Sequence, residues 1–217
     1  MKHVTGEIEA AGEAHVKVPS KRSLAKQQTR QKVLQAARKL FSEQGYEGAT
    51  IRDIASAAGM STGAVFANFS DKSDLFREIL FSDINELADL MREAASRART
   101  VEESLLRVFM AGYAFYKGQM PLARAAFSIS WTTEEARELR NIGPVQQLTE
   151  IVTELLAQGV ERGELSRESE IKLRSQMLFE AYLANYPNAI FGGWSLEALQ
   201  ARTRDQIRII LAGARRG

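Results

Sequence analysis

Residues 51–70 read IRDIASAAGMSTGAVFANFS, and this stretch decides the first part of the fold. Apolar residues recur at helical spacing on both sides of Ala58-Gly59-Met60, which predicts two short helices joined by a tight turn. Ala55 is small enough to let the helices approach closely, Gly59 can adopt the positive φ of a sharp turn, and Val65 lies where the second helix presses on the first. This spacing is typical of a helix-turn-helix, whose second helix, 61–68, enters the DNA major groove.

The remainder of the chain also has helical periodicity. An amphipathic helix is predicted over 29–44, ending at Gly45, and Thr50 is predicted to cap the next helix with Asp53 completing an approximate capping box. A long helix is expected from Ser70-Asp71 onward. Further helices are predicted at 101–118, 121–131, 134–162 with an interruption near Gly143-Pro144, 168–191 and 195–213. No strand-period alternation persists, so the predicted fold class is all-α.

Charge is distributed unevenly along the 217 residues, although Lys plus Arg total 29 and Asp plus Glu total 27. Residues 17–80 hold 11 basic and six acidic residues, and eight of those cations lie between Lys17 and Lys39 with no acid among them. The flanking segments, 1–16 and 81–217, are acidic to nearly neutral. Such a basic run is either a solvated helix face with a tail, or the electrostatic footprint of a module that binds phosphate.

Composition argues against an enzyme. The chain has no cysteine, and its two histidines, His3 and His15, lie in the polar N-terminal stretch. A disulfide framework, a thiolate metal site and a cysteine nucleophile are excluded, and a histidine-based triad or zinc site is not expected. We therefore predict no cofactor and no metal. Residues 1–16 lack the apolar run of a signal peptide, and no stretch reaches about 18 uninterrupted apolar residues, so a cytoplasmic protein without membrane contact is expected.

The stretch from Thr29 to Leu80 resembles the DNA-binding domain of TetR-family transcriptional regulators. The matching residues are Phe41, Gly45-Tyr46, Thr50, Ile54-Ala55, Ala58-Gly59, Ser61, Gly63, Phe69, Lys72 and Leu75. The resemblance implies a flexible N-terminal tail at 1–25, a three-helix helix-turn-helix domain at 26–72, and a larger helical domain for ligand binding and dimerisation at 73–217. It implies a dimeric repressor released from a palindromic operator in double-stranded DNA by a small-molecule effector. The alternative is an activator or an effector-independent DNA-binding protein.

The resemblance also assigns DNA contacts. The candidate residues are Arg30, Thr50, Arg52, Ser61, Thr62, Gly63, Ala64, Phe66, Asn68 and Lys72. Thr50 and Lys72 correspond to phosphate contacts, and Gly63 and Ala64 would let the backbone lie close to DNA while Thr62 reads base edges. Two positions depart from the family, which usually has Tyr at Phe66 and often His or Tyr at Asn68. Because Phe66 has no hydroxyl to offer a phosphate, core packing is the alternative role for its ring, as it is for Phe69.

The C-terminal helices are expected to bind a partly apolar effector and to form a homodimer. The candidate ligand residues are Phe109, Tyr113, Arg124, Phe127, Trp131, Met177, Glu180 and Tyr182. The aromatic residues could equally be core, and Arg124 could either anchor an anion or stack on Trp131. Residues 177–191 are apolar nearly all round, which predicts a helix buried on every side and packed with 195–213 at a four-helix dimer interface. The polar groups of that segment, Glu180, Tyr182 and Asn185, are either ligand contacts or interface hydrogen bonds.

Overall fold

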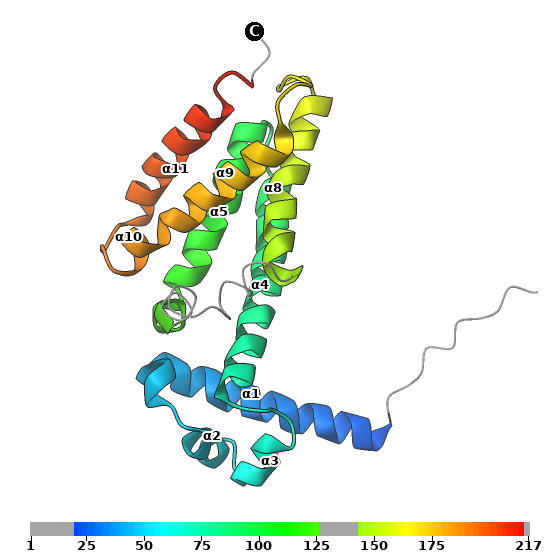
Figure 1. The fold of residues 1–217 in the computed structure, drawn as a ribbon, viewed down its shortest axis with the longest axis vertical. Helices are drawn as coiled ribbons and strands as arrows, with labels where there is room; N and C mark the ends of the chain where they lie inside the picture. The colour runs from blue at the N-terminus through cyan, green and yellow to red at the C-terminus, as the bar shows by residue number, and fades with distance from the viewer. Residues whose placement is uncertain (1–19, 126–142, 215–217) are drawn as a thin grey trace, which may run out of the picture.

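The computed structural model describes residues 20–125 and 143–214, and these residues form helices and no strand (Figure 1). The helices are α1 (Lys21–Gly48), α2 (Ile51–Ala57), α3 (Thr62–Phe66), α4 (Lys72–Ser96), α5 (Val101–Lys117), α8 (Gly143–Glu161), α9 (Ile171–Ala184), α10 (Tyr186–Ile190) and α11 (Leu196–Leu211). A further short helical stretch covers 120–125. The all-α prediction is confirmed. Within the described ranges, no helix is both long enough and apolar enough to cross a membrane.

The N-terminal core is built by α1, α2, α3 and the first part of α4. Helices α2 and α3 are too short to bury a core of their own, so Ile54 and Val65 pack against Phe41 of α1 and Leu75 of α4. This core extends to Ile79, past the expected domain boundary at residue 72. It also receives Leu122 and Ala125 from the distant stretch 120–125, so the two halves of the chain share packing.

The turn between α2 and α3 has the predicted geometry. Gly59 has a φ of +68°, Met60 N donates to Ala55 O at 2.9 Å, and Gly59 N donates to Ser56 O at 3.1 Å. These bonds satisfy the last carbonyls of α2 in the manner of a Schellman motif. Thr50 caps α2 by accepting from Asp53 N at 3.2 Å. The sequence-based prediction of a capped helix, a glycine turn and a second helix is therefore confirmed.

Helix α1 differs from the expectation at its start. It begins at Lys21, with Ser20 as its N-cap, rather than at residue 29. Residues 21–28 are all exposed, so this part of α1 extends beyond the packed core. Lys, Arg, Leu, Ala and Gln all have favourable helix propensity, which lets the helix continue without tertiary contacts. At the other end, the predicted stop at Gly45 is seen as a break in α1, where φ is +76°.

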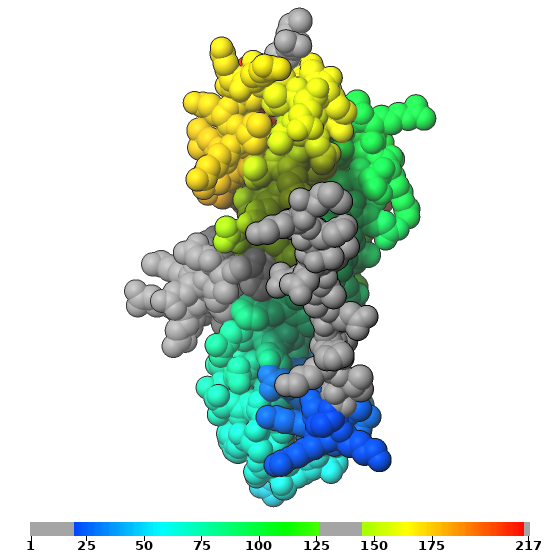
Figure 2. All heavy atoms as spheres, turned by 90° about the vertical axis from the view of Figure 1, so that its right-hand side faces the viewer, coloured from blue at the N-terminus to red at the C-terminus, as the bar shows by residue number. Residues whose placement is uncertain are grey.

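Helix α4 passes from the N-terminal core into the C-terminal core, where it packs against α5 and α8 (Figure 1). Helix α9 packs on α8, and α11 packs on α5 and α9. Seen from the side, the N-terminal helices occupy one end of the molecule and α8 and α9 the other (Figure 2). The predicted helices 121–131 and 134–162 lie only partly in the described residues. The predicted helix 168–191 is divided into α9 and α10 at Asn185, because Pro187 falls in the first turn of α10 and has no N–H to continue the α9 ladder.

The expectation that 177–191 is buried on every side is wrong. Leu178, Tyr182 and Tyr186 are buried, but Met177 is 44% exposed and Phe191 is 62% exposed. The prediction treated 177–191 as one helix. The segment is instead divided into α9 and α10, and one face of α9 lies at the surface. A helix with apolar residues on two faces needs a partner only for the face that its neighbours leave open.

Candidate nucleic-acid interface

The first turn of α3 is held out into solvent. Val65 and Phe69 are buried beneath it, and Ser61 caps it by accepting from Ala64 N at 3.2 Å. Ser61, Thr62 and Gly63 are exposed, and Ala64 is half-buried. Gly63 does not have a positive φ, and a Cβ built on it would meet only Ser61 Oγ at 3.8 Å. The fold therefore does not require glycine at position 63, and its small size matters only for what approaches this surface.

The two phenylalanines of the motif have different environments. Phe69 is buried in the N-terminal core, whereas Phe66 is 55% exposed. This contradicts core packing as the role of Phe66 and leaves its ring on the surface, on the same helix as Thr62. An exposed phenylalanine offers an apolar surface to a partner but no hydrogen bond.

Arg30 and Asn68 anchor α3 from within. Arg30 forms an ion pair with Glu78 of α4, donates from Nη1 to Asn68 O at 2.6 Å, and lies 4.2 Å from the centroid of the Phe69 ring. Asn68 Nδ2 donates to Ala64 O at 2.9 Å. The guanidinium of Arg30 and the amide nitrogen of Asn68 are thus engaged inside the domain, whereas Asn68 Oδ1 is buried without a hydrogen-bond partner; Glu78 compensates the charge of Arg30. A direct contact to DNA by either side chain remains a prediction.

Lys72 stands at the start of α4 and is held there by Tyr46. Its Nζ donates to Tyr46 O at 2.9 Å, lies 4.3 Å from the Tyr46 ring centroid, and is 4.0 Å from Glu47 Oε2. Sequence reasoning placed Tyr46 at the end of helix one but did not give it this role. Thr50 is exposed, and its hydroxyl donates to Asp53 Oδ2 at 2.5 Å, so any phosphate contact there would fall to neighbouring groups such as the exposed Arg52.

The basic run on α1 divides into two kinds of cation. Arg30 and Arg38 are half-buried and ion-paired, and the exposed Lys39 pairs with Glu43 at 3.9 Å. Lys21, Arg22, Lys26 and Lys32 are exposed and form no ion pair with the described residues. Most of the positive charge of α1 is therefore free to act on an external partner.

The predicted ligand residues Phe109, Tyr113 and Tyr182 belong to a buried aromatic cluster. Phe109 and Tyr182 are stacked at 4.9 Å between centroids, and Tyr113 donates to Tyr182 O at 3.0 Å. Asn185 Nδ2 donates to the Tyr113 hydroxyl at 3.0 Å. Burial raises the pKa of Tyr113 to about 12, so the phenol is neutral at physiological pH. The cavity beside this cluster measures about 10 Å³, no more than a single water needs.

The remaining candidate ligand residues lie elsewhere. Met177 and Glu180 are exposed on the outer side of α9. Arg124 is exposed, and its Nη2 donates to Ile190 O at 3.3 Å. Phe127 and Trp131 lie outside the described residues. The described part of the chain therefore does not bring the predicted ligand residues into one pocket. Sequence reasoning also missed Tyr116 and Tyr186, which join the aromatic cluster through ring contacts.

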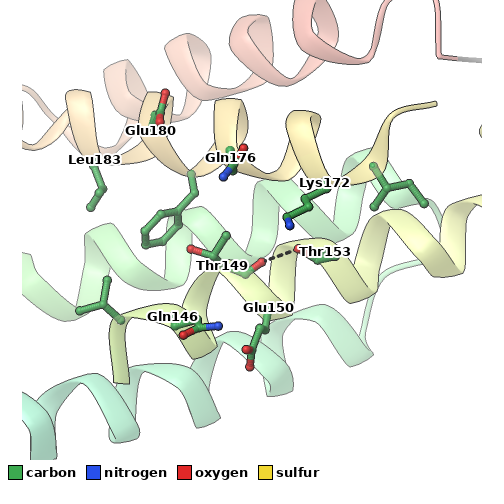
Figure 3. Close-up of a pocket in the computed structure, with 11 residues that line it drawn as sticks. Gln146, Thr149, Glu150, Thr153, Lys172, Gln176, Glu180 and Leu183 are labelled. Atoms are coloured by element: carbon green, nitrogen blue, oxygen red, sulfur yellow. Dashed lines mark hydrogen bonds between the residues drawn. The ribbon is translucent and has the colours of Figure 1, made fainter. Parts of the chain in front are cut away.

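A groove of about 850 Å³ lies between α8 and α9 on the outside of the molecule. Figure 3 shows residues of the two helices facing each other across it. Its lining combines polar and apolar groups, among them Gln146, Thr149, Glu150, Lys172, Gln176, Phe179 and Glu180. No sequence signal marked this groove, because it arises only from the way in which the successive helices α8 and α9 pack together. The described residues contain no cluster of three or more His, Asp or Glu that could hold a metal ion.

Comparison with known proteins agrees with this geometry. Residues 33–79, which span α1 to the end of the N-terminal core in α4, match the family described as bacterial regulatory proteins, tetR family. These N-terminal residues of the chain are therefore similar to the DNA-binding domain of TetR-family regulators. The proteins of this family that the chain matches are transcription regulators, in agreement with the prediction that it is not an enzyme.

Three relatives illustrate the extent of the similarity. The transcriptional repressor AcnR of Corynebacterium glutamicum is 43% identical over 65 residues, which are 30% of this chain and 35% of that protein. The fatty acid metabolism regulator protein of Bacillus subtilis is 23% identical over 148 residues, covering 68% of this chain and 76% of that protein. The crystal structure of Bacillus subtilis FadR in complex with stearoyl-CoA has the same fold, with a TM-score of 0.69 at 20% identity over 84% of this chain and 98% of that one. The chain thus aligns with about a third of the length of AcnR.

Proposed function

We propose that this protein is a DNA-binding transcription regulator of the TetR family, a dimeric repressor that a small-molecule effector releases from a palindromic operator. The observation that carries the proposal is the exposed first turn of α3, which the fold holds out on the buried Val65 and Phe69. The similarity of this domain to the repressor AcnR supports the direction of regulation. The unpaired cations of α1 supply the attraction to phosphate that any such protein needs.

Footprinting on the DNA that flanks the chain's own gene tests this proposal. We expect a protected palindrome with half-site centres about 34–36 Å apart, or a multiple of that, because two recognition helices of a symmetric dimer must enter successive major grooves. Selection from random duplexes extends the test to operators elsewhere. Absence of any preferred sequence in both experiments would contradict the proposal.

In the proposed complex, α3 lies in the major groove with its N-terminal turn on the base edges. Thr62 would contact bases through its methyl and hydroxyl groups, and the exposed ring of Phe66 would lie against a thymine methyl or a sugar. Ser61 and Arg52 are exposed beside α3, where they are available for contacts to the phosphates. Arg30 and Asn68 would act from inside the domain by holding α3 in place.

Lys72→Ala is expected to weaken binding to all DNA sequences and to reduce the slope of log affinity against log salt by about one. The physical reason is that one phosphate is no longer neutralised by the protein, so one counterion fewer is released on binding. The same variant lacks the bond to Tyr46 O, so thermal unfolding should be followed in parallel. Lys117→Ala, which removes an exposed cation in the C-terminal domain, is the matched control and should leave the slope unchanged.

The exposed start of α1 is expected to bind phosphates that flank the half-site. Replacing Lys21, Arg22 and Lys26 by glutamine should lower affinity for a duplex with long flanks, and the salt slope should fall by about 0.9 for each phosphate that is no longer neutralised. A duplex trimmed to the operator core should bind this variant and the unchanged protein equally. An equal reduction in affinity on both duplexes would place these cations on the half-site itself.

We propose that the dimer forms through the outer faces of α8 and α9, in place of the predicted pair of last helices. Leu173 and Met177 of α9 are 52% and 44% exposed, and the groove between α8 and α9 adjoins α9. The outer face of α11 exposes Ile209, but it also carries Arg204, Asp205 and Arg208. Charged residues are depleted at the centres of interfaces, because burying them requires loss of their hydration. Lys172 and Glu180 of α9 and Glu150 of α8 also lie at this face, so the proposal rests on apolar exposure: α9 exposes two large apolar side chains one turn apart, Leu173 and Met177, where α11 exposes Ile209.

Met177→Glu is expected to raise the dimer dissociation constant at least tenfold, because a charge would be buried at the centre of the proposed interface. Sedimentation velocity over a range of concentrations measures this. Arg204→Asp on the outer face of α11 is the control and should leave the dimer intact. The opposite pattern, with only the α11 variant dissociating, would restore the interface that the sequence predicted.

The proposed effector is partly apolar, and acyl-CoA thioesters are the first class to test. The support is the similarity in fold to FadR, whose structure holds stearoyl-CoA. Stearoyl-CoA should raise the unfolding temperature and release the operator, whereas CoA alone should do neither. The alternative, an effector-independent DNA-binding protein, is favoured by the filled aromatic cluster around Tyr182. Unchanged stability and operator affinity with acyl-CoA, phenol and antibiotic probes would support that alternative.

A further inference from the structure

A buried acidic side chain lies where the two hydrophobic cores meet on α4. The residues before it, Leu75, Phe76 and Ile79, belong to the N-terminal core, and those after it, beginning with Ile84, belong to the C-terminal core. Asp83 lies between these groups and is only 1% exposed. A carboxylate buried among apolar residues is unfavourable without a partner, so its position at the junction needs an explanation.

Arg38 of α1 is the partner, and it joins three parts of the chain. Its Nη2 forms an ion pair with Asp83 of α4, and its Nη1 donates to Gln119 Oε1 at 3.1 Å. Gln119 directly precedes the stretch 120–125. In that stretch Leu122 and Ala125 pack in the N-terminal core, while Ala123 between them packs in the C-terminal core. Arg38 therefore ties the helix-turn-helix domain to the two elements that cross the junction.

The bonding of this group is incomplete, which permits a second arrangement. Asp83 Oδ2 is buried and has no hydrogen-bond partner, while Arg38 divides its two terminal nitrogens between Asp83 and Gln119. A guanidinium can instead bind both oxygens of one carboxylate. A shift of 119–125 that withdraws Gln119 would free Nη1 to satisfy Oδ2. The two arrangements exchange one hydrogen bond for another, so the balance between them depends on where 119–125 lies.

We propose that Arg38, Asp83 and Gln119 form an interdomain latch that sets the angle at which the C-terminal domain carries the recognition helix. Arg38 is the positioning residue of the latch. Through its hydrogen bond to Gln119, the orientation of α1 depends on where 119–125 lies. The consequence for DNA rests on the proposed function, because a dimer matches its operator only when its two recognition helices have the correct spacing and orientation. The consequence for domain orientation does not depend on DNA.

Substituting both charged residues separates positioning from stability. Replacement of a buried ion pair by apolar residues is often neutral or stabilising, whereas removal of one partner leaves a buried charge unpaired. Arg38→Met leaves the buried Asp83 unpaired and should lower the unfolding temperature, whereas the double variant Arg38→Met, Asp83→Leu should recover most of that decrease. If the latch sets orientation, the double variant should nevertheless lack a defined interdomain angle. If the ion pair only stabilises the fold, the double variant should recover both the unfolding temperature and the interdomain angle of the parent.

Interdomain orientation is measured by the distance between spin labels on Ser56→Cys of α2 and Arg202→Cys of α11. Both positions are exposed and the chain has no cysteine of its own. Labelled protein is diluted with unlabelled protein to remove distances between subunits. We expect a single narrow distance in the parent, a broadened or shifted one in the double variant, and a shifted one in Gln119→Ala. Arg107→Met, which removes an ion pair within α5, should leave the distance unchanged.

Operator affinity is measured on the same proteins. We expect the double variant to bind the operator at least tenfold more weakly than the parent, despite its recovered stability. A double variant with the parent's distance and affinity would overturn the latch. If the parent itself binds no specific DNA, the proposed function fails, while the distances still decide whether the latch exists.

Discussion

Replacing Gly112 by alanine is expected to lower the free energy of unfolding by about 3 kcal/mol, the upper end of the usual cost of overpacking a core. A Cβ built on Gly112 would lie 2.0 Å from the Tyr182 hydroxyl oxygen, 2.9 Å from Tyr182 Cζ and 3.0 Å from Met91 Cε. Tyr182 cannot move aside easily. It is buried, stacked on Phe109, and its hydroxyl is bonded to that of Tyr186.

Urea unfolding of Gly112→Ala, made both in the parent protein and in the Tyr182→Phe variant, tests this explanation. In Tyr182→Phe the nearest atom is absent, so the added methyl should cost at least about 1 kcal/mol less there, an interaction energy typical of residues in contact. Gly118→Ala on the same segment is the control. Its Cβ would meet only backbone oxygens, the nearer being Phe115 O at 3.5 Å, which is ordinary contact, so it should be nearly neutral. Additive costs of the Gly112 and Tyr182 changes would show that this contact is not the cause.

Replacing Gly63 by leucine is expected to reduce operator affinity about 100-fold, equivalent to about 2.7 kcal/mol, without lowering stability. The fold leaves space for a side chain at this position, since a Cβ would approach only Ser61 Oγ at 3.8 Å and φ is not positive. In the proposed complex the same space is occupied by DNA. A leucine there would hold α3 away from the base edges and weaken every contact of its first turn.

Titration of a labelled operator with Gly63→Ala and Gly63→Leu, alongside thermal unfolding, measures both properties. Alanine should have a smaller effect than leucine, because one methyl displaces the helix less. Ala201→Leu adds similar bulk at an exposed position of α11 and should change neither property. If Gly63→Leu binds the operator as tightly as the parent, the DNA interface does not lie at the first turn of α3.

Short-range features of the DNA-binding domain were predictable because their causes are local. The positive φ at Gly59, the Thr50 cap and the break at Gly45 each depend on a few neighbouring residues. Phe69, for which core packing was one of the roles considered, is buried. The exposure of Phe66 did not follow from the pattern, because the pattern left both a core role and a surface role open.

The junction and the C-terminal domain were much less predictable. Asp83 interrupts an apolar stripe of α4, and that interruption was the one signal of a buried ion pair that the sequence contained. Nothing in the sequence identified Arg38 or Gln119 as its partners, since both lie many helical turns away along the chain. The candidate ligand residues were chosen by composition, and packing separates Tyr182 in the core from Met177 at the surface of the same helix.

By itself, the sequence determined the all-α class, the helix-turn-helix and its caps and turn, and the concentration of positive charge on α1. Hydrogen bonds between residues a few positions apart and the propensities of single residues are sufficient for these features. Only the tertiary structure decided that Phe66 is exposed, that Arg38 joins Asp83 and Gln119 across the domain junction, and that α8 and α9 enclose a groove. These features depend on how helices cross one another, whether they are far apart in the chain, as α1 and α4 are, or successive, as α8 and α9 are; the crossing is decided by complementary packing of their side chains.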